Sequence, residues 1–377
     1  FDGHGFVAQA ASQGAAAAMV DRAWAAANPV PLPLLVVDDT RIGLGQLAAG
    51  WRARFELPLI GVTGSNGKTT VKEMCAAILR ARARREGLDP DLAVLATRGN
   101  LNNDIGLPLM LLRLSGNHRA AVIEMGMNHP GEIGYLTRLA APTVALVNNA
   151  QRAHLEGMGS VNEVAREKGA IYEGLSADGV AVVNADDAFA GYWKALNAGR
   201  RVLTFGLRAG ADVTAQVTSH GFASDLVLAS PKGAASFRLQ VPGEHNVLNA
   251  LSAIAVAVEL NVPDDALLRA LAGCDPTKLV TLGSPVDGVI PPAAQRLPGL
   301  PALQHHGANL TAVAQAVAAG GVHVELPAFA PGFTMETALL PSSYRVHLSW
   351  SEAKHRLINQ LIRAASAVPE PTKTGAR

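Results

Sequence analysis

The sequence has little cysteine and no long apolar run. Its two cysteines, Cys75 and Cys274, lie far apart among 377 residues, which argues against a disulfide framework or a cysteine-rich zinc site and indicates a reducing compartment. No apolar stretch is long enough to span a bilayer, and no charged-then-apolar signal peptide is present. We therefore expect a cytoplasmic protein without membrane insertion.

An excess of charge of either sign is also missing. Lys and Arg number 32 against 31 Asp and Glu, a formal net charge of +1. This balance argues against a nucleic-acid partner and against an acidic tail. The length suggests two or three domains with enough material for a core. Because the chain begins at Phe1 rather than Met, we expect natural N-terminal residues to be missing.

The most informative stretch is Gly61-Val-Thr-Gly-Ser-Asn-Gly-Lys-Thr-Thr70. It follows an apolar run that predicts a buried strand, and a helix is expected over 68–81. This order is typical of a loop that binds nucleotide phosphates, because glycines let the backbone approach and the helix start attracts anions. The residues expected to bind nucleotide are Gly64, Ser65, Asn66, Gly67, Lys68, Thr69 and Thr70.

Within this loop we expect Lys68 to reach the β- and γ-phosphates and the Thr69 hydroxyl to hold Mg²⁺. The strict pattern G-x-x-x-x-G-K-[ST] is not met, because Val62 stands where its first glycine belongs. An ordinary strand–turn–helix corner is the structural alternative.

Apolar strands alternate with helices after this loop. Strands are expected over 93–97, 120–125, 143–148, 180–184 and 201–205, and helices over 131–139, 161–175 and 189–197. The alternation predicts an α/β fold with a mostly parallel central sheet and helices on both faces. Ligands of such sheets bind beyond the carboxyl ends of the strands, so polar residues there are the candidates.

Three of these candidates carry a charge or an imidazole. Glu124 ends one expected strand, where its carboxylate could reach the Mg²⁺ at the phosphate loop. His154 lies in a loop after a strand, and Lys168 lies on a helix among other charged residues. Taken singly, Glu124 could cap a helix, His154 could be structural, and Lys168 could belong to a solvated charge cluster.

A second polar group follows antiparallel hairpins expected over 212–240. His245, Asn246 and Asn249 lie near the first turn of an alanine-rich helix that runs to about Leu260. His245 and Asn249 are four residues apart and face the same way. An imidazole can stack on a base and a carboxamide can bond its edge, although N-terminal capping explains Asn246 about as well.

Taken together, the motifs resemble those of the Mur ligases of bacterial peptidoglycan synthesis, in order and from about residue 1 to 272. They are Asp2-Gly-His4, Thr63-Gly-Ser-Asn-Gly-Lys-Thr-Thr70, Thr97-Arg-Gly-Asn-Leu-Asn-Asn-Asp-Ile-Gly-Leu-Pro108, Glu124-Met-Gly-Met-Asn128, Ala153-His-Leu-Glu-Gly-Met-Gly-Ser160, Lys168-Gly169, Asn184-Ala-Asp-Asp187 and Gly243-x-His-Asn-x-x-Asn249. The first and third stretches point to the branch whose substrates are UDP-N-acetylmuramoyl-tripeptide and D-alanyl-D-alanine.

The resemblance implies a function and roles. Such a ligase uses ATP to activate a carboxylate as an acyl phosphate, which an amine attacks to give a peptide bond, ADP and phosphate. Two Mg²⁺ sites are implied, one held by Thr69 and Glu124 and the other by His154 and a Lys168 carbamylated by CO₂. Catalytic roles are implied for Lys68, Lys168 and His154, and adenine contacts for Asn246 and Asn249, with His245 nearby. We expect a monomer.

The resemblance also divides the chain into three parts. Residues 1–52 correspond to part of a UDP-substrate-binding domain, 53–275 to the central ATP-binding ligase domain, and 276–377 to an atypical C-terminal segment with a disordered tail. That segment holds 11 of the 22 prolines and lacks the family's Asp-x-Tyr-Asn-x-Asn-Pro stretch and Gly-Arg pair. A shifted reading frame or a substituted sequence is our hypothesis for it. Ala170 is another departure, because the family usually has Glu there.

Three functional hypotheses remain. The first is the peptide ligase, with weak or absent activity in this chain because the expected third domain is not recognisable. The second is an ATP-binding protein that does not catalyse. The third is a relative such as folylpolyglutamate synthase, against which the stretch 98–108 argues.

Overall fold

The computed structural model describes residues 2–153, 155–208, 210–220 and 223–272. Two sequence-based expectations lie outside these residues. They are the metal-ligand role of His154 and the atypical segment 276–377.

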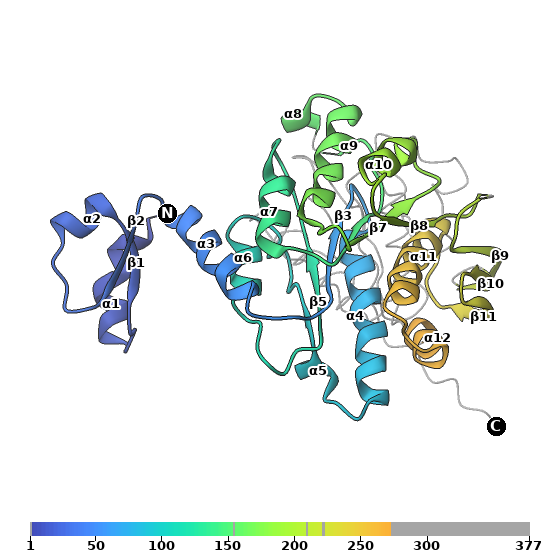
Figure 1. Ribbon diagram of the computed structural model, residues 1–377, viewed down its shortest axis with the longest axis horizontal. Coiled ribbons are helices and arrows are strands. Elements are labelled where there is room, and N and C mark those ends of the chain that lie inside the picture. Colours follow the sequence, from blue (N-terminus) through green and yellow to red (C-terminus); the bar gives the residue numbers. More distant parts are fainter. Residues whose placement is uncertain (1, 154, 209, 221–222, 273–377) are drawn as a thin grey trace, which may run out of the picture.

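A parallel six-stranded sheet forms the centre of the described structure (Figure 1). In spatial order its strands are β4 (Val94–Ala96), β5 (Ala120–Glu124), β3 (Leu59–Thr63), β6 (Val144–Val147), β7 (Val180–Asn184) and β8 (Arg201–Phe205). Leu59 packs into the core on one face of the sheet and Ile60 into the core on the other. Both faces are buried, so the strands are apolar throughout. The predicted α/β class is confirmed.

Helices cover both faces of this sheet. On one face lie α4 (Lys68–Arg85) and α11 (Glu244–Glu259), with α12 (Asp264–Ala272) packed against α4. The other face is covered by α3 (Thr40–Arg52), α6 (Gly106–Leu111), α7 (Glu132–Ala140), α9 (Val161–Gly169) and α10 (Ala190–Leu196). Shorter pieces are α5 (Pro90–Ala93), α8 (Leu155–Met158) and the 3₁₀ turn η2 (Ala170–Gly174).

The strand order reverses beside β3. The chain leaves β3 for the edge strand β4, returns to β5, and then crosses over β3 to reach β6. Open α/β sheets bind ligands beyond the carboxyl ends of their strands at such a reversal. The phosphate loop directly follows β3, so the topology places it at this position.

Two smaller sheets flank the central one. The antiparallel sheet of β9 (Thr214–His220), β10 (Ala223–Ser230) and β11 (Gly233–Leu239) confirms the expected hairpins. The N-terminal unit contains η1 (Gly3–Phe6), α1 (Val7–Ser12), β1 (Ala18–Asp21), α2 (Arg22–Ala27) and β2 (Leu34–Val37), with β1 and β2 parallel. In Figure 1 this unit lies apart at the left, and α3 runs from it to the central sheet.

Some element bounds differ from the prediction. Helix α4 continues to Arg85 rather than ending near residue 81, and Arg82 bonds Glu86 one turn further on, which supports the added turn. The single helix expected over 161–175 divides into α9 and η2.

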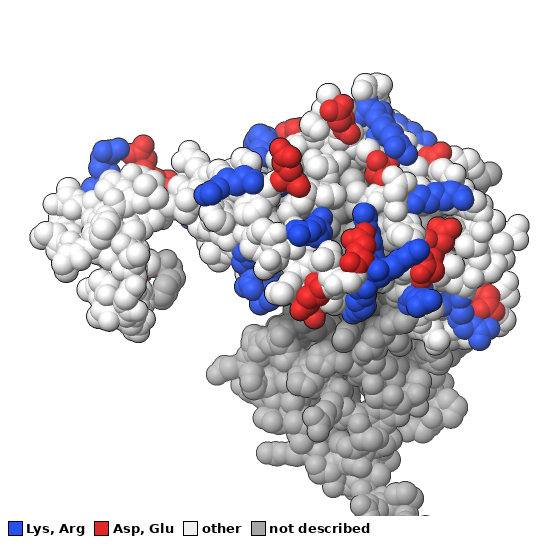
Figure 2. All heavy atoms as spheres, turned by 60° about the horizontal axis from the view of Figure 1, so that its bottom comes forward, with Lys and Arg blue, Asp and Glu red and all other residues white. Residues whose placement is uncertain are grey.

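Charged side chains of both signs alternate on the face that carries the end of α4. Arg82 pairs with Glu86, and Arg85 pairs with Asp265 of α12. Figure 2 shows Lys and Arg interspersed with Asp and Glu over the described part of this face, while the N-terminal unit presents few charges there. Among the described helices, none is long and apolar enough to cross a bilayer.

Candidate functional site

The phosphate loop makes a tight turn that requires glycine at its end. Gly67 caps α4 with a φ of +77°, in the left-handed region that other residues rarely adopt. A Cβ at this position would collide with the Asn249 side chain. The loop is therefore closed from behind by α11, and its N–H groups lie at the start of an 18-residue helix, where the helix dipole favours an anion.

The segment that follows β6 supports the loop. Asn66 N donates to Asn149 Oδ1 at 2.9 Å, and Ser65 N donates to the carbonyl of the same residue at 3.0 Å. Asn66 Nδ2 donates to Gln151 Oε1 at 2.6 Å, and Asn148 Nδ2 donates to the Asn66 carbonyl at 3.0 Å. These bonds fix the loop's shape, so it need not be ordered by the ligand.

Lys68 turns back over the loop. Its Nζ donates to the Gly64 carbonyl at 2.8 Å. Burial lowers the pKa of this ammonium, while the nearby carboxylate of Glu124 opposes that effect. A cation beside the N–H groups at the start of a helix is suited to a polyphosphate.

Glu124 and Thr69, the two predicted ligands of one metal, are in contact. Thr69 Oγ1 donates to Glu124 Oε2 at 3.0 Å. A hydroxyl and a carboxylate oxygen side by side match the oxygen ligands that Mg²⁺ prefers, so the residues fit this ion. Among the described residues, no group of three or more His, Cys, Asp or Glu is placed to hold a metal. Mg²⁺ usually takes one or two carboxylates, with phosphates and water as its other ligands.

Lys168 is buried, with a relative exposure of 1%, contrary to the solvated cluster that its sequence neighbours suggested. Burial lowers the pKa of its ammonium well below the ordinary value, and the positive charge of Lys68 acts in the same direction, against Glu167. The Glu167 carboxylate accepts hydrogen bonds from Gly131 N and Ile133 N at the start of α7, both at 2.7 Å. Lys168 thus lies on a helix anchored to the neighbouring one.

His245, Asn246 and Asn249 share the first turns of α11 but differ in exposure. His245 is exposed, whereas both asparagines are buried. Asn249 Nδ2 donates to Asn246 Oδ1 at 3.2 Å, and Asn249 Oδ1 accepts from Asn148 Nδ2 at 2.8 Å. The asparagines therefore brace the phosphate loop through Asn148, and their predicted adenine contacts stay a prediction.

Other polar residues, which the sequence analysis named only within motifs, complete the site. Asn102 Nδ2 donates to Glu124 Oε1 at 2.8 Å, and Thr97 Oγ1 accepts from Glu124 N at 2.9 Å. Asn184 Nδ2 donates to the Asn148 carbonyl at 2.8 Å. The available signal was position, since each of these residues lies at or just after the carboxyl end of a strand.

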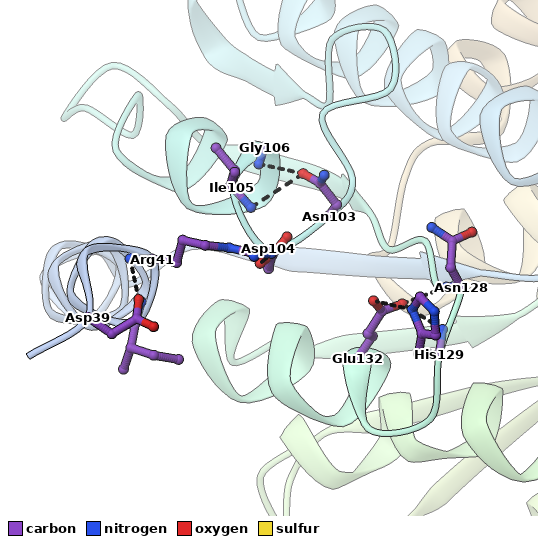
Figure 3. Close-up of polar contacts among 10 residues, drawn as sticks. Asp39, Arg41, Asn103, Asp104, Ile105, Gly106, Asn128, His129 and Glu132 are labelled. Carbon is purple, nitrogen blue, oxygen red and sulfur yellow. Dashed lines mark hydrogen bonds and ion pairs between the residues drawn. The ribbon is translucent and has the colours of Figure 1, made fainter. Parts of the chain in front are cut away.

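Two loops beside Glu124 are held by short caps (Figure 3). Asn103 Oδ1 accepts from Gly106 N at 2.8 Å at the start of α6, and Glu132 accepts from the N–H groups of Asn128 and His129 at the start of α7. Asn103, Asn128 and His129 are exposed. The loops that follow β4 and β5 therefore carry exposed polar side chains.

An ion pair ties the first of these loops to α3. Arg41 of that helix pairs with Asp104, as Figure 3 shows. Asp39 caps α3 by accepting from Arg41 N at 2.7 Å. The N-terminal unit is therefore linked to the loop that carries Asn102 and Asn103.

Comparison with known proteins identifies related chains. The family model described as the Mur ligase middle domain matches residues 62–257, just over half of the chain. The UDP-N-acetylmuramoyl-tripeptide–D-alanyl-D-alanine ligase of Escherichia coli is 43% identical over 276 residues, covering 72% of this chain and 58% of that protein. The Haemophilus influenzae protein of the same name is 45% identical over 261 residues, covering 69% and 55%.

Solved structures agree with this match. MurF from Acinetobacter baumannii superposes with a TM-score of 0.65 at 37% identity, over 73% of this chain and 58% of that one. The MurF ligase from Thermotoga maritima in complex with ADP gives a TM-score of 0.60 at 26% identity, over 73% and 61%. The chain spans a little more than half the length of the curated relatives it matches. With a family model over half of its residues and relatives above 40% identity, this chain belongs to the Mur ligase family.

Proposed function

We propose that this chain provides the ATP-binding half of a ligase that joins D-alanyl-D-alanine to UDP-N-acetylmuramoyl-tripeptide through an acyl phosphate. The names of the curated relatives support the substrates, and the relative with bound ADP supports the nucleotide. The single observation that carries the proposal is the contact of Thr69 with Glu124 beside the Lys68 ammonium, at the mouth of a preformed phosphate loop.

The chemistry sets the demands on these residues. A carboxylate that attacks a polyphosphate brings like charges together, so the site must supply positive charge and donors. Backbone N–H groups at the start of α4 and the Lys68 ammonium bind and orient the phosphates. Thr69 and Glu124 would hold Mg²⁺, which would supply positive charge to the phosphate oxygens.

Lys168 is proposed as the carbamylated residue. A lowered pKa leaves more of its amine neutral, and a neutral amine nitrogen bonds to CO₂ with loss of a proton, giving an anion. That anion, together with His154, would hold the second Mg²⁺. Carbon-13 NMR of the protein in ¹³C-bicarbonate should show a protein-bound carbamate that is missing from Lys168→Arg.

Two measurements test the function. Calorimetry should show Mg²⁺-dependent ATP binding by the chain, and Thr69→Val should weaken it. A phosphate-release assay with both UDP-N-acetylmuramoyl-tripeptide and D-alanyl-D-alanine should give weak or no turnover, because the chain spans little more than half of its relatives. Absence of ATP binding would refute the proposal. Release at a rate matching full-length relatives would contradict only the expectation of weak activity.

The setting of this reaction is part of the proposal. We place the protein in the cytoplasm as a monomer, without a nucleic-acid partner. Sedimentation of the purified chain with and without ATP should give a single species of about its 39.1 kDa mass.

A further inference from the structure

Lys72 is a buried lysine to which the proposed reaction assigns no role. It lies on α4 one turn after Lys68, and its side chain is 1% exposed. Its Nζ donates to the Thr97 carbonyl at 2.9 Å and pairs with Glu73 Oε1 at 2.8 Å. Burying an ammonium is costly unless it is paired and hydrogen-bonded, so a lysine here calls for a specific reason.

The group that Lys72 holds is connected to the predicted metal ligand. Thr97 follows β4, the edge strand of the sheet, and is itself buried. Its N–H donates to the Val122 carbonyl at 3.0 Å, and its Oγ1 accepts from Glu124 N at 2.9 Å. Thr97 therefore accepts a hydrogen bond from Lys72 at its carbonyl and another from the Glu124 N–H at its hydroxyl.

The Glu124 carboxylate is restrained at its other end too. Oε2 accepts from Thr69 and Oε1 accepts from Asn102 Nδ2 at 2.8 Å. Gly126 N in turn donates to the Asn102 carbonyl at 2.8 Å, and a Cβ on Gly126 would press on the Asn102 side chain. The orientation of the Glu124 carboxylate thus depends on where the ends of β4 and β5 lie relative to α4.

We propose that Lys72 is a positioning residue that sets the metal-binding geometry of Glu124 through Thr97. It spans from α4, which carries Thr69, to the end of β4, and so fixes the two predicted Mg²⁺ ligands relative to each other. This inference rests on the proposed function, because it assigns Lys72 to the Mg²⁺ site of that function. Partners of this kind typically change metal affinity by about 10–100-fold when removed.

Mg²⁺-dependent nucleotide binding tests the inference. The affinity for a fluorescent ATP analogue is measured with Mg²⁺ and with EDTA in the wild type, Lys72→Met and Thr97→Val. A positioning role predicts about tenfold weaker binding in Mg²⁺ for both variants and a change of less than about twofold in EDTA. Thr97→Ser retains the hydroxyl and should recover most of the loss.

A matched control is available on the separate antiparallel sheet. Lys232 Nζ also donates to a backbone carbonyl, that of Val262, at 3.2 Å. Lys232→Met removes the same kind of bond and should leave both affinities unchanged. Thermal unfolding of every variant shows whether the fold is retained, and Thr97→Val serves if Lys72→Met does not fold.

The outcomes separate the two proposals. Equal losses with Mg²⁺ and with EDTA would make Lys72 a general structural residue and overturn the inference, as would unchanged binding of Lys72→Met in Mg²⁺. Either result leaves the proposed function standing if the wild type binds the analogue. A wild type that binds no nucleotide overturns the proposed function, and the inference with it.

Discussion

At the scale of single residues, charge placement decides what this site can bind. The positive charge of Lys68 adds to the effect of burial in lowering the pKa of the Lys168 ammonium, whereas the Glu124 carboxylate opposes the effect of burial on the pKa of Lys68. The Lys68 ammonium therefore supplies positive potential beside the N–H groups at the start of α4. A polyphosphate anion neutralises this positive potential, whereas a neutral ligand cannot.

The charge of Lys68 can be removed without a large change of shape. Lys68→Met should weaken Mg²⁺-ATP binding by about 2–3 kcal/mol, roughly 30–150-fold, because a charge-assisted bond to phosphate is lost. Titration calorimetry measures this. Lys194→Met, at an exposed position on α10, is the control and should bind normally. Equal affinities in all three proteins would contradict the assignment.

The candidate residues were predictable to different degrees. The sequence pattern of 61–70 identified the loop, and strand-end position indicated Glu124. Burial of Lys168 was not visible from its charged neighbours, because helix α9 presents that side chain to the core and Arg166 to solvent. Asn148 and Thr97 act through contacts with residues 82–101 and 25–27 positions away, which no local pattern reveals.

At the scale of elements, close packing between the loop and α11 shapes the site. Gly67 meets Asn249, and Asn249 is held by Asn148 and Asn246. A helix far along the chain therefore sets the space available to the loop.

Two glycines with nearly the same φ separate backbone strain from this contact. Gly87 has a φ of +74° with open space around it, whereas Gly67 at +77° faces Asn249. Gly87→Ala should cost roughly 1–2 kcal/mol of stability, the cost of left-handed backbone for an L-residue. Gly67→Ala should cost more in urea unfolding and should also weaken ATP binding.

A double variant tests whether the contact with Asn249 is what makes Gly67→Ala costly. Adding Asn249→Ala to Gly67→Ala removes the nearer of the two side chains that the new methyl would strike, the other being Asn148, so the double variant should lose less than the sum of the two single changes. Additive losses would show that the Asn249 contact does not limit the space at Gly67.

The hairpin of β10 and β11 provides a pH-dependent contact. Asp225 lies opposite Arg238, which donates to it at 2.7 and 2.8 Å. These bonds lower the pKa of the Asp225 carboxyl from 3.8 to about 2, so the pair stabilises the folded state above pH 4. That contribution should be lost as the pH falls through about 2.

Comparison with Asp225→Asn measures this contribution. The difference in free energy of unfolding between wild type and variant should be small, because the pair is exposed, and should shrink between about pH 4 and pH 2. Carboxyl NMR of Arg238→Gln should show the Asp225 pKa closer to its ordinary value. A difference that grows on acidification would contradict the sign.

At the scale of the whole molecule, the sheet and its two helical layers form a unit that does not depend on the N-terminal segment. Among the described residues, no member of either buried core precedes Ala48. The N-terminal unit reaches the rest through α3 and the ion pair of Arg41 with Asp104.

This separation predicts the effect of a deletion. A chain that starts at Asp39 keeps the cap of α3 and both cores, so it should fold and bind Mg²⁺-ATP within about threefold of the wild type. Circular dichroism and the binding titration measure the two properties. Loss of ATP binding by a folded deletion protein would show that the N-terminal unit contributes to the site.

The α/β class, the phosphate loop and most strand positions could be predicted from the sequence, because buried parallel strands and glycine-rich turns leave local patterns that need no distant partner. Which polar groups come into contact is set by the tertiary structure. Contact between Thr69 and Glu124, the bracing of Gly67 by α11, and the burial of Lys72 and Lys168 all arise from strand order and helix packing, which join residues far apart in the chain. Such contacts depend on the whole topology, so local spacing cannot specify them.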